Sequence, residues 1–158
     1  MKYLIDLGKG IKDSPELRKI AMDMAQFMFT KSQENLLKPM PWGDEKYRSD
    51  KKDTTISNNG DILKSGVPPY WEGDNKIVFR YDTPISFYVE YGTPPHMPPV
   101  EPIVEWAEKK LRKGKKDAQS IGWAVAMTIK KEGMPPHPFV RPAIDSARIK
   151  YGLNIKGL

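Results

Sequence analysis

Proline constrains the fold of this chain more than any other residue, because it fixes φ and removes a backbone hydrogen-bond donor. The sequence contains 15 prolines in 158 residues, well above the average usage of about 5%. They cluster, most densely in Pro94–Pro99 and Pro135–Pro138. Rigid turns and extended segments are therefore expected at these positions.

The rest of the composition is that of an ordinary globular protein. Apolar residues make up 39% of the chain and charged residues 29%, so we expect one folded domain spanning residues 1–158. Cysteine is absent, which excludes disulfides, thiolate zinc ligands and cysteine nucleophiles. The N-terminal apolar run is too short for a signal-peptide core, and no run reaches the ~18 residues of a membrane span. We expect neither export nor membrane insertion.

The first predicted element is a long helix over Pro15–Leu37. Ser14 can cap it, Pro15 suits the first helical position, and Pro39 stops it. Its predicted apolar stripe has three- and four-residue spacing and consists of Leu17, Ile20, Ala21, Met24, Phe27 and Met28.

Residues 39–59 are polar and of mixed charge, and no core face can be drawn through them. We expect a long loop or arm that is mobile in the free subunit and becomes ordered against a neighbour. A disordered insertion is an equal alternative.

Three strands are predicted next, over Asp61–Val67, Lys76–Tyr81 and Pro84–Tyr91, which together suggest a small antiparallel sheet. Two helices follow: one begins near Pro102, with Gly114 at the position of a left-handed cap, and one begins at Asp117 and ends at Gly133. An extended stretch and a short helix that opens at Pro142 complete the chain. The predicted class is α+β, with a long N-terminal helix and further helices packed on a small antiparallel β-sheet.

The residues give little support to catalysis. The two histidines, His96 and His137, sit in similar Gly-x-Pro-Pro-His frames, but two imidazoles without a third ligand make a weak metal site. The acidic fragments Asp44-Glu45-Lys46 and Asp74-Asn75-Lys76 have a composition similar to that of a metal-dependent nuclease site. A solvated charged loop explains each of them better. We therefore predict no cofactor, no metal and no enzymatic activity.

A basic cluster stands out in a chain of formal net charge +6. One interpretation is a solvated helix C-terminus, where cations interact favourably with the dipole. The other is a sequence-independent contact with a nucleic-acid backbone. The cluster consists of Lys109, Lys110, Arg112, Lys113, Lys115 and Lys116.

Two segments resemble one known family. They are Phe87–Pro99, FYVEYGTPPHMPP, and Gly133–Ala143, GMPPHPFVRPA. This pair, in this order, is similar to the neck, or tail-completion, proteins of long-tailed double-stranded DNA bacteriophages. Asn59–Ser65 is similar to a further motif of that family, with Asn where the family often has Thr. The resemblance covers about Asn59 to Ile149, together with a generic N-terminal helix, and Pro39–Gly60 has no counterpart.

The resemblance implies a virion structural protein, made in the host cytoplasm, that forms a ring, expected to be sixfold, at the head-to-tail junction. Its partners would be copies of itself and adjacent neck and tail proteins, and the basic cluster could face the passing double-stranded DNA. A free-standing, non-specific nucleic-acid-binding protein is the alternative.

We predict an assembly interface at a sheet edge around Tyr88 to Gly92 and at the aromatic and guanidinium pair that opens the last helix. Internal roles are equally open for that pair, with Phe139 in the core and Arg141 paired with Asp145. The predicted interface residues are Tyr88, Glu90, Tyr91, Gly92, Phe139 and Arg141.

Overall fold

Residues 1–8, 13–37 and 61–152 are described by the computed structural model. The chain divides into two compact units: Met1–Glu90 with His137–Leu158 form unit 1, and Tyr91–Pro136 form unit 2. The single domain expected from the sequence stays a prediction. The arm predicted over residues 39–59 lies outside the described residues.

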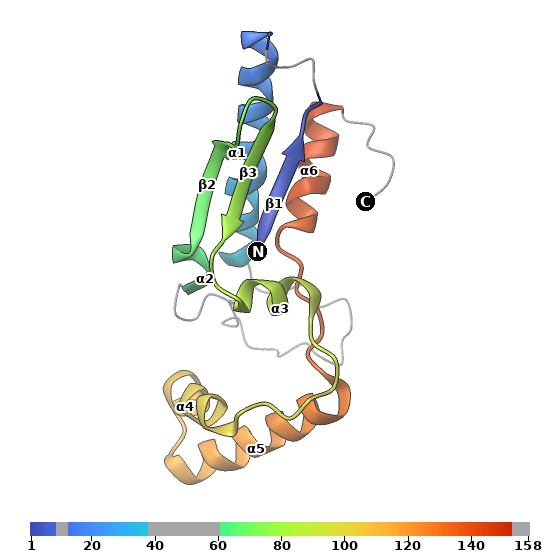
Figure 1. Ribbon diagram of the computed structural model, residues 1–158. Coiled ribbons are helices and arrows are strands. Elements are labelled where there is room, and N and C mark those ends of the chain that lie inside the picture. Colours follow the sequence, from blue (N-terminus) through green and yellow to red (C-terminus); the bar gives the residue numbers. More distant parts are fainter. Residues whose placement is uncertain (9–12, 38–60, 153–158) are drawn as a thin grey trace. The chain divides into compact units, whose positions relative to one another are not determined.

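Unit 1 is built on a three-stranded antiparallel sheet with the order β1-β3-β2 (Figure 1). The strands are β1 (Lys2–Asp6), β2 (Gly66–Trp71) and β3 (Lys76–Tyr81). Tyr3 pairs with Phe79 across β1 and β3. The strand predicted over Lys76–Tyr81 is therefore confirmed, and it is the central one.

The edge position of β2 explains how this strand tolerates two prolines. Pro68 and Pro69 cannot donate to a ladder, and proline in sheets is confined to edges and bulges. The register between β2 and β3 shifts between Val67 and Tyr70, at the point where the prolines lie.

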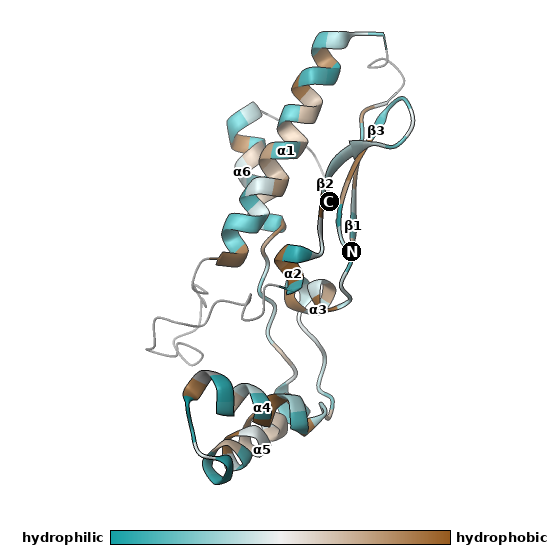
Figure 2. Ribbon diagram, turned by 90° about the vertical axis from the view of Figure 1, so that its left-hand side faces the viewer, coloured by the Kyte–Doolittle hydropathy of each residue, from teal (hydrophilic) through white to brown (hydrophobic). Residues whose placement is uncertain are grey.

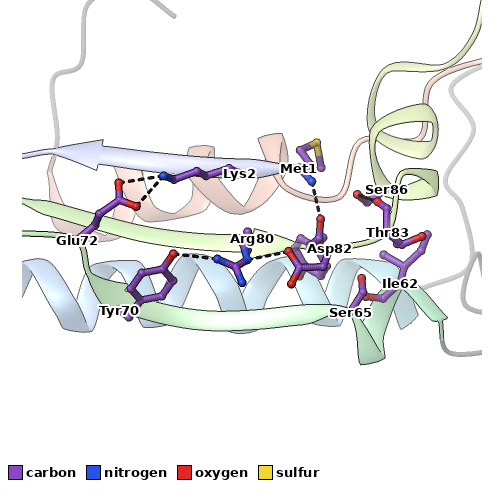
Figure 3. Close-up of polar contacts among 11 residues, drawn as sticks. Met1, Lys2, Ile62, Ser65, Tyr70, Glu72, Arg80, Asp82, Thr83 and Ser86 are labelled. Atoms are coloured by element: carbon purple, nitrogen blue, oxygen red, sulfur yellow. Dashed lines mark hydrogen bonds and ion pairs between the residues drawn. The ribbon is translucent and has the colours of Figure 1, made fainter.

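Side-chain contacts also join β1 to the turn that precedes β3, and β3 to β2 (Figure 3). Lys2 Nζ lies 2.7 Å from Glu72 Oε1, and Arg80 donates to Asp82 at 2.7 Å and to the hydroxyl of Tyr70 at 3.1 Å. These side chains are substantially exposed, and ion pairs of this kind are each worth about 0–1 kcal/mol. The backbone ladder and the buried face carry most of the sheet's stability.

The structure corrects the predictions for two strands and contains one strand that was not predicted. Asp61–Lys64 is a short helix, α2, and the strand starts only at Gly66. Ile85–Tyr91 is a helix, α3, although its aromatic and β-branched residues predicted a strand. A chain reversal starts it, because Ser86 N and Oγ both donate to Thr83 O. Strand β1 was not predicted.

Helices α1 (Pro15–Leu37) and α6 (Arg141–Tyr151) cover one face of the sheet (Figure 2). The predicted bounds of α1 are confirmed. Its buried stripe starts later than expected, since Leu17 and Ile20 are 48% and 53% exposed. The buried positions of α1 are Ala21, Met24, Ala25, Met28, Phe29, Ser32 and Leu36.

Aromatic side chains form the centre of unit 1. The ring of Phe79 stacks on Tyr3 with centroids 5.1 Å apart, and the ring of Tyr81 meets Phe139 edge-on, also at 5.1 Å. The Tyr81 hydroxyl lies 2.6 Å from Ser32 Oγ, which donates to the carbonyl of Phe29. Burial raises the pKa of Tyr81 to about 12, because the phenolate would lose its solvation; the Ser32 bond opposes this rise and the Glu90 charge adds to it.

Unit 2 is a helical hairpin of α4 (Val100–Leu111) and α5 (Lys115–Glu132). Small side chains let the two helices approach closely. A Cβ atom on Gly122 would lie 2.4 Å from Cγ2 of Val104. The fully buried alanines of the hairpin are Ala107, Ala118 and Ala126.

The turn between the helices differs from the prediction. Arg112, at φ 49° and ψ 41°, takes the left-handed conformation expected of Gly114, and Gly114 is instead the N-cap of α5. Asp117 lies in the first turn of α5 rather than capping it. The predicted end of α5 at Gly133 is confirmed: φ is 76° there, and its N–H donates to the carbonyl of Ile129.

Candidate assembly site

The two segments that carry the family resemblance meet at Glu90, in the last turn of α3. Its side chain is fully buried. Oε2 accepts hydrogen bonds from the backbone N–H groups of Phe139 at 2.7 Å and Val140 at 3.0 Å. Oε1 accepts from the backbone N–H and from Nε of Arg141, both at 3.1 Å. Each carboxylate oxygen therefore has two donors.

This carboxylate caps helix α6. The helix begins at Arg141, and its N-cap residue, Val140, has no side chain that can accept a hydrogen bond. The first N–H groups of a helix lack intrahelical partners, and the dipole there favours negative charge. Glu90 supplies the acceptor and the charge from 51 residues away in the sequence.

The capping is reciprocal between the two helices. Arg141 Nη2 donates to the backbone carbonyl of Glu90 at 2.7 Å, at the C-terminal end of α3, where a cation is favourable. The ion pair between Glu90 and Arg141 thus caps both the end of α3 and the start of α6. Arg141 does not use Asp145, the alternative considered from the sequence; that carboxylate lies 3.2 Å from Arg148.

His137 lies on the return path just before this site. It is 7% exposed, and its backbone N–H donates to the carbonyl of Val89 at 2.7 Å. Burial lowers the pKa of His137 to about 4, against a smaller opposing influence of the Glu90 charge. The ring is therefore neutral near pH 7.

The two Gly-x-Pro-Pro-His frames pair with each other through their backbones, and we call this pairing the crossing. Their residues as far as Pro136 belong to unit 2. Thr93 N donates to Met134 O at 2.9 Å, and Met134 N donates to Thr93 O at 3.1 Å. Gly92 and Gly133 have φ of 75° and 76°, and a Cβ on either would lie within 2.4 Å of a carbonyl oxygen of the other frame. The similar frames are two halves of one crossing in which glycine is required at both positions.

The two histidines have the surroundings of structural residues rather than of metal ligands. His96 is exposed, and its Nδ1 lies 2.9 Å from the carbonyl oxygen of Pro94. In the part of the chain that the structure describes, no three or more His, Asp and Glu side chains come together as metal ligands could. Asp44, from one acidic fragment considered above, lies outside the described residues.

Helix α3 shows aromatic side chains to solvent on the side away from the buried Ser86, Val89 and Glu90. Its exposed side chains are about half accessible, between 48% and 52%. We call them the α3 surface: Ile85, Phe87, Tyr88 and Tyr91.

The predicted interface residues separate into three groups. Tyr88 and Tyr91 lie on the α3 surface, and Arg141 has a half-exposed side chain. Glu90 and Phe139 are fully buried in unit 1, because they cap and pack against the start of α6. Gly92 takes part in the crossing. The predicted sheet edge at Tyr88–Gly92 is wrong, since this segment is helical to Tyr91.

Sequence reasoning missed Ile85 and Phe87 because it treated the segment as a strand. A helical period was present in the sequence, since Ser86, Val89 and Glu90 are spaced by three and four residues. That spacing would have placed Phe87 and Tyr91 on one outer face.

The basic cluster occupies the turn of the hairpin. Lys109 and Lys110 end α4, Arg112 and Lys113 lie in the turn, and Lys115 and Lys116 begin α5. The dipole favours cations at the end of α4 but opposes them at the start of α5. The solvated-cap interpretation therefore explains the cations at the end of α4 but not Lys115 and Lys116. The exposed members are Lys109, Arg112, Lys113, Lys115 and Lys116.

The chain matches no protein-family model, no curated protein and no solved structure. Among the described residues, no helix is both long enough and apolar enough to cross a membrane.

Proposed function

We propose that this chain is a non-enzymatic structural protein of the bacteriophage neck, which assembles into a ring at the head-to-tail junction and completes the tail. One observation carries the proposal. The two segments that resemble the neck family are joined to each other through Glu90 and Arg141, and helix α3, whose residues Phe87–Tyr91 begin the first of them, displays apolar side chains to solvent.

The contacts at Glu90 support a structural use of these segments. All four hydrogen bonds to the carboxylate come from the backbone and the guanidinium group of the second segment. A carboxylate so fully occupied serves to fix α3 against α6 rather than to exchange protons with a substrate. Such rigidity is useful at an interface, because a fixed surface loses little entropy on binding.

The α3 surface is the proposed contact with an adjacent neck or tail protein. Exposed aromatic clusters often mark protein interfaces, and tyrosine is enriched among residues that dominate binding energy. The rings of Phe87 and Tyr88 are 6.0 Å apart and nearly perpendicular. They present a broad apolar area on a helix that Glu90 holds in place.

Co-expression with the products of the neighbouring genes tests this proposal. Wild-type chain should co-purify with a head-proximal or tail protein, and the double variant Phe87→Ser/Tyr88→Ser should lose that partner. The expected weakening is at least about tenfold, because two half-exposed aromatic side chains are removed. Its matched control is Ile149→Ser, which removes an 85% exposed apolar side chain on α6. Retention of the partner by the double variant, with an unchanged circular dichroism spectrum, would contradict the proposal.

Non-specific nucleic-acid binding is the second candidate, and the exposed cations at the start of α5 favour it. Lys115 and Lys116 lie where the helix dipole offers them no stabilisation. In this case the chain alone should bind duplex DNA with an affinity that falls steeply with salt and does not depend on sequence. Absence of binding at low ionic strength would remove this candidate.

A further inference from the structure

An open groove runs along the helical hairpin of unit 2, with a volume of about 420 Å³. Its apolar lining comes from Val100 and Val104 of α4 and from Trp123 of α5, and the indole is 49% exposed. We call it the Trp123 groove. An exposed tryptophan in a groove is typical of a surface that receives another side chain.

One edge of the groove is acidic. Glu101, Glu105 and Glu108 line it, and their spacing of four and three residues places them on one side of α4. Lys109 lies 3.3 Å from Glu105, but both side chains are largely exposed and such a pair is weak. On the α5 side, Lys115 is the one cation that lines the groove. An occupant with an apolar stem and a positive end fits these walls.

The same hairpin presents such side chains at its turn. Arg112 and Lys113 are exposed there. Among the described residues, Arg112 is the one non-glycine residue with positive φ, a conformation that costs about 1–2 kcal/mol for a side chain with a Cβ. The fold therefore holds this arginine in an uncommon conformation just beyond the end of α4.

We propose that the turn of one copy docks into the Trp123 groove of a second copy, and that this contact links subunits. The Arg112 guanidinium would lie over the Trp123 indole and pair with the glutamates, while Lys113 adds charge. The two surfaces differ, so the contact is heterologous and repeats from copy to copy until a ring closes. This inference rests on the proposed function, because it supplies the self-contact of the ring.

Charge reversal separates this docking from other uses of the turn. One variant reverses the groove, Glu101→Lys/Glu105→Lys/Glu108→Lys, and the other reverses the turn, Arg112→Glu/Lys113→Glu. Wild type should self-associate at low ionic strength in analytical ultracentrifugation, and each variant alone should associate at least about tenfold more weakly. An equimolar mixture should recover association, since each variant's turn then meets a groove of opposite charge.

Lys130→Glu/Lys131→Glu is the matched control, because it makes the same change of net charge at two exposed lysines at the other end of α5. It should associate like wild type. The docking contact is overturned if the mixture fails to associate, if wild type stays monomeric at every concentration, or if the control is as defective as the turn variant.

The outcomes also distinguish this contact from the proposed function. If the variants lose self-association but still co-purify with the neighbouring neck or tail proteins, both proposals hold. If self-association is unaffected by either reversal while the neighbours are still recovered, only the docking contact fails. If the turn variant loses duplex DNA binding and the mixture does not associate, the turn is a nucleic-acid surface and the docking contact is overturned.

Discussion

Glu90 is a charged side chain in the interior of unit 1, and its removal should strongly destabilise that unit. Glu90→Ala leaves the N–H groups of Phe139 and Val140 buried without their acceptor and removes the carboxylate that pairs with Nε of Arg141. We expect a loss of about 3–5 kcal/mol in the free energy of unfolding, measured by urea denaturation. Asp145→Ala, on the same helix, removes an exposed carboxylate and should cost no more than about 0.5 kcal/mol. Equal losses in the two variants would show that the Glu90 cap at α6 stabilises the fold no more than an exposed carboxylate does.

His137 should make stability depend on pH. Its pKa is lowered to about 4 in the folded chain, because burial disfavours the imidazolium, while the ordinary value of 6.5 applies after unfolding. Between these values the unfolded chain binds the proton and the folded chain does not. Stability should therefore fall as pH decreases from about 6.5 to about 4. Denaturation at several pH values should show a flatter profile for His137→Gln than for wild type and for His96→Gln. An unchanged profile in His137→Gln would rule out this residue as the cause.

At the scale of elements, the crossing of the two Gly-x-Pro-Pro-His frames depends on two glycines. Gly133→Ala combines positive φ with a Cβ placed 2.1 Å from Thr93 O, whereas Gly73→Ala has a similar φ of 74° and open space around its Cβ. Both carry the backbone cost of about 1–2 kcal/mol, and Gly133→Ala should lose about 1–3 kcal/mol more from the clash. Native-state hydrogen exchange, read in the unit that holds each substitution, measures both. Similar losses would mean that the crossing can open to accept a methyl group.

Local sequence signals predicted α1 and β3 correctly, because the residues of these elements themselves determine their secondary structure. Helix α1 has a capping serine, a proline at its start and a long apolar stripe, and every second residue of β3 from Ile77 to Tyr81 is apolar and buried. Helix α3 has the composition of a strand, and its helical form depends on a start at Thr83 and on burial of Glu90 by a distant segment. Strand β1 is five residues long and is fixed by pairing with β3 across the sequence. Local propensity carries no information on such partners.

For the molecule as a whole, the sequence indicated which segments form the candidate site but not how they are arranged in it. The resemblance selected the two segments that carry Glu90 and Arg141. It did not indicate that the glutamate points inward and that the aromatic residues of α3 point outward, because this depends on contacts between residues 51 apart. The division into two units was also not predicted, since unit 2 begins at Tyr91, just before one proline-rich segment, and ends at Pro136 within another, and both segments have the composition of simple turns.

The paired backbones at Thr93 and Met134 have a consequence for how such a chain can change in evolution. They bring the entry and the exit of the helical hairpin side by side. The hairpin is therefore an excursion whose two ends are held together. We expect that whole turns of α4 and α5 can be added, deleted or exchanged together while the paired backbones at the base of the hairpin are kept. Diversification of the chain should then concentrate in the hairpin, and the glycines at its base should change least.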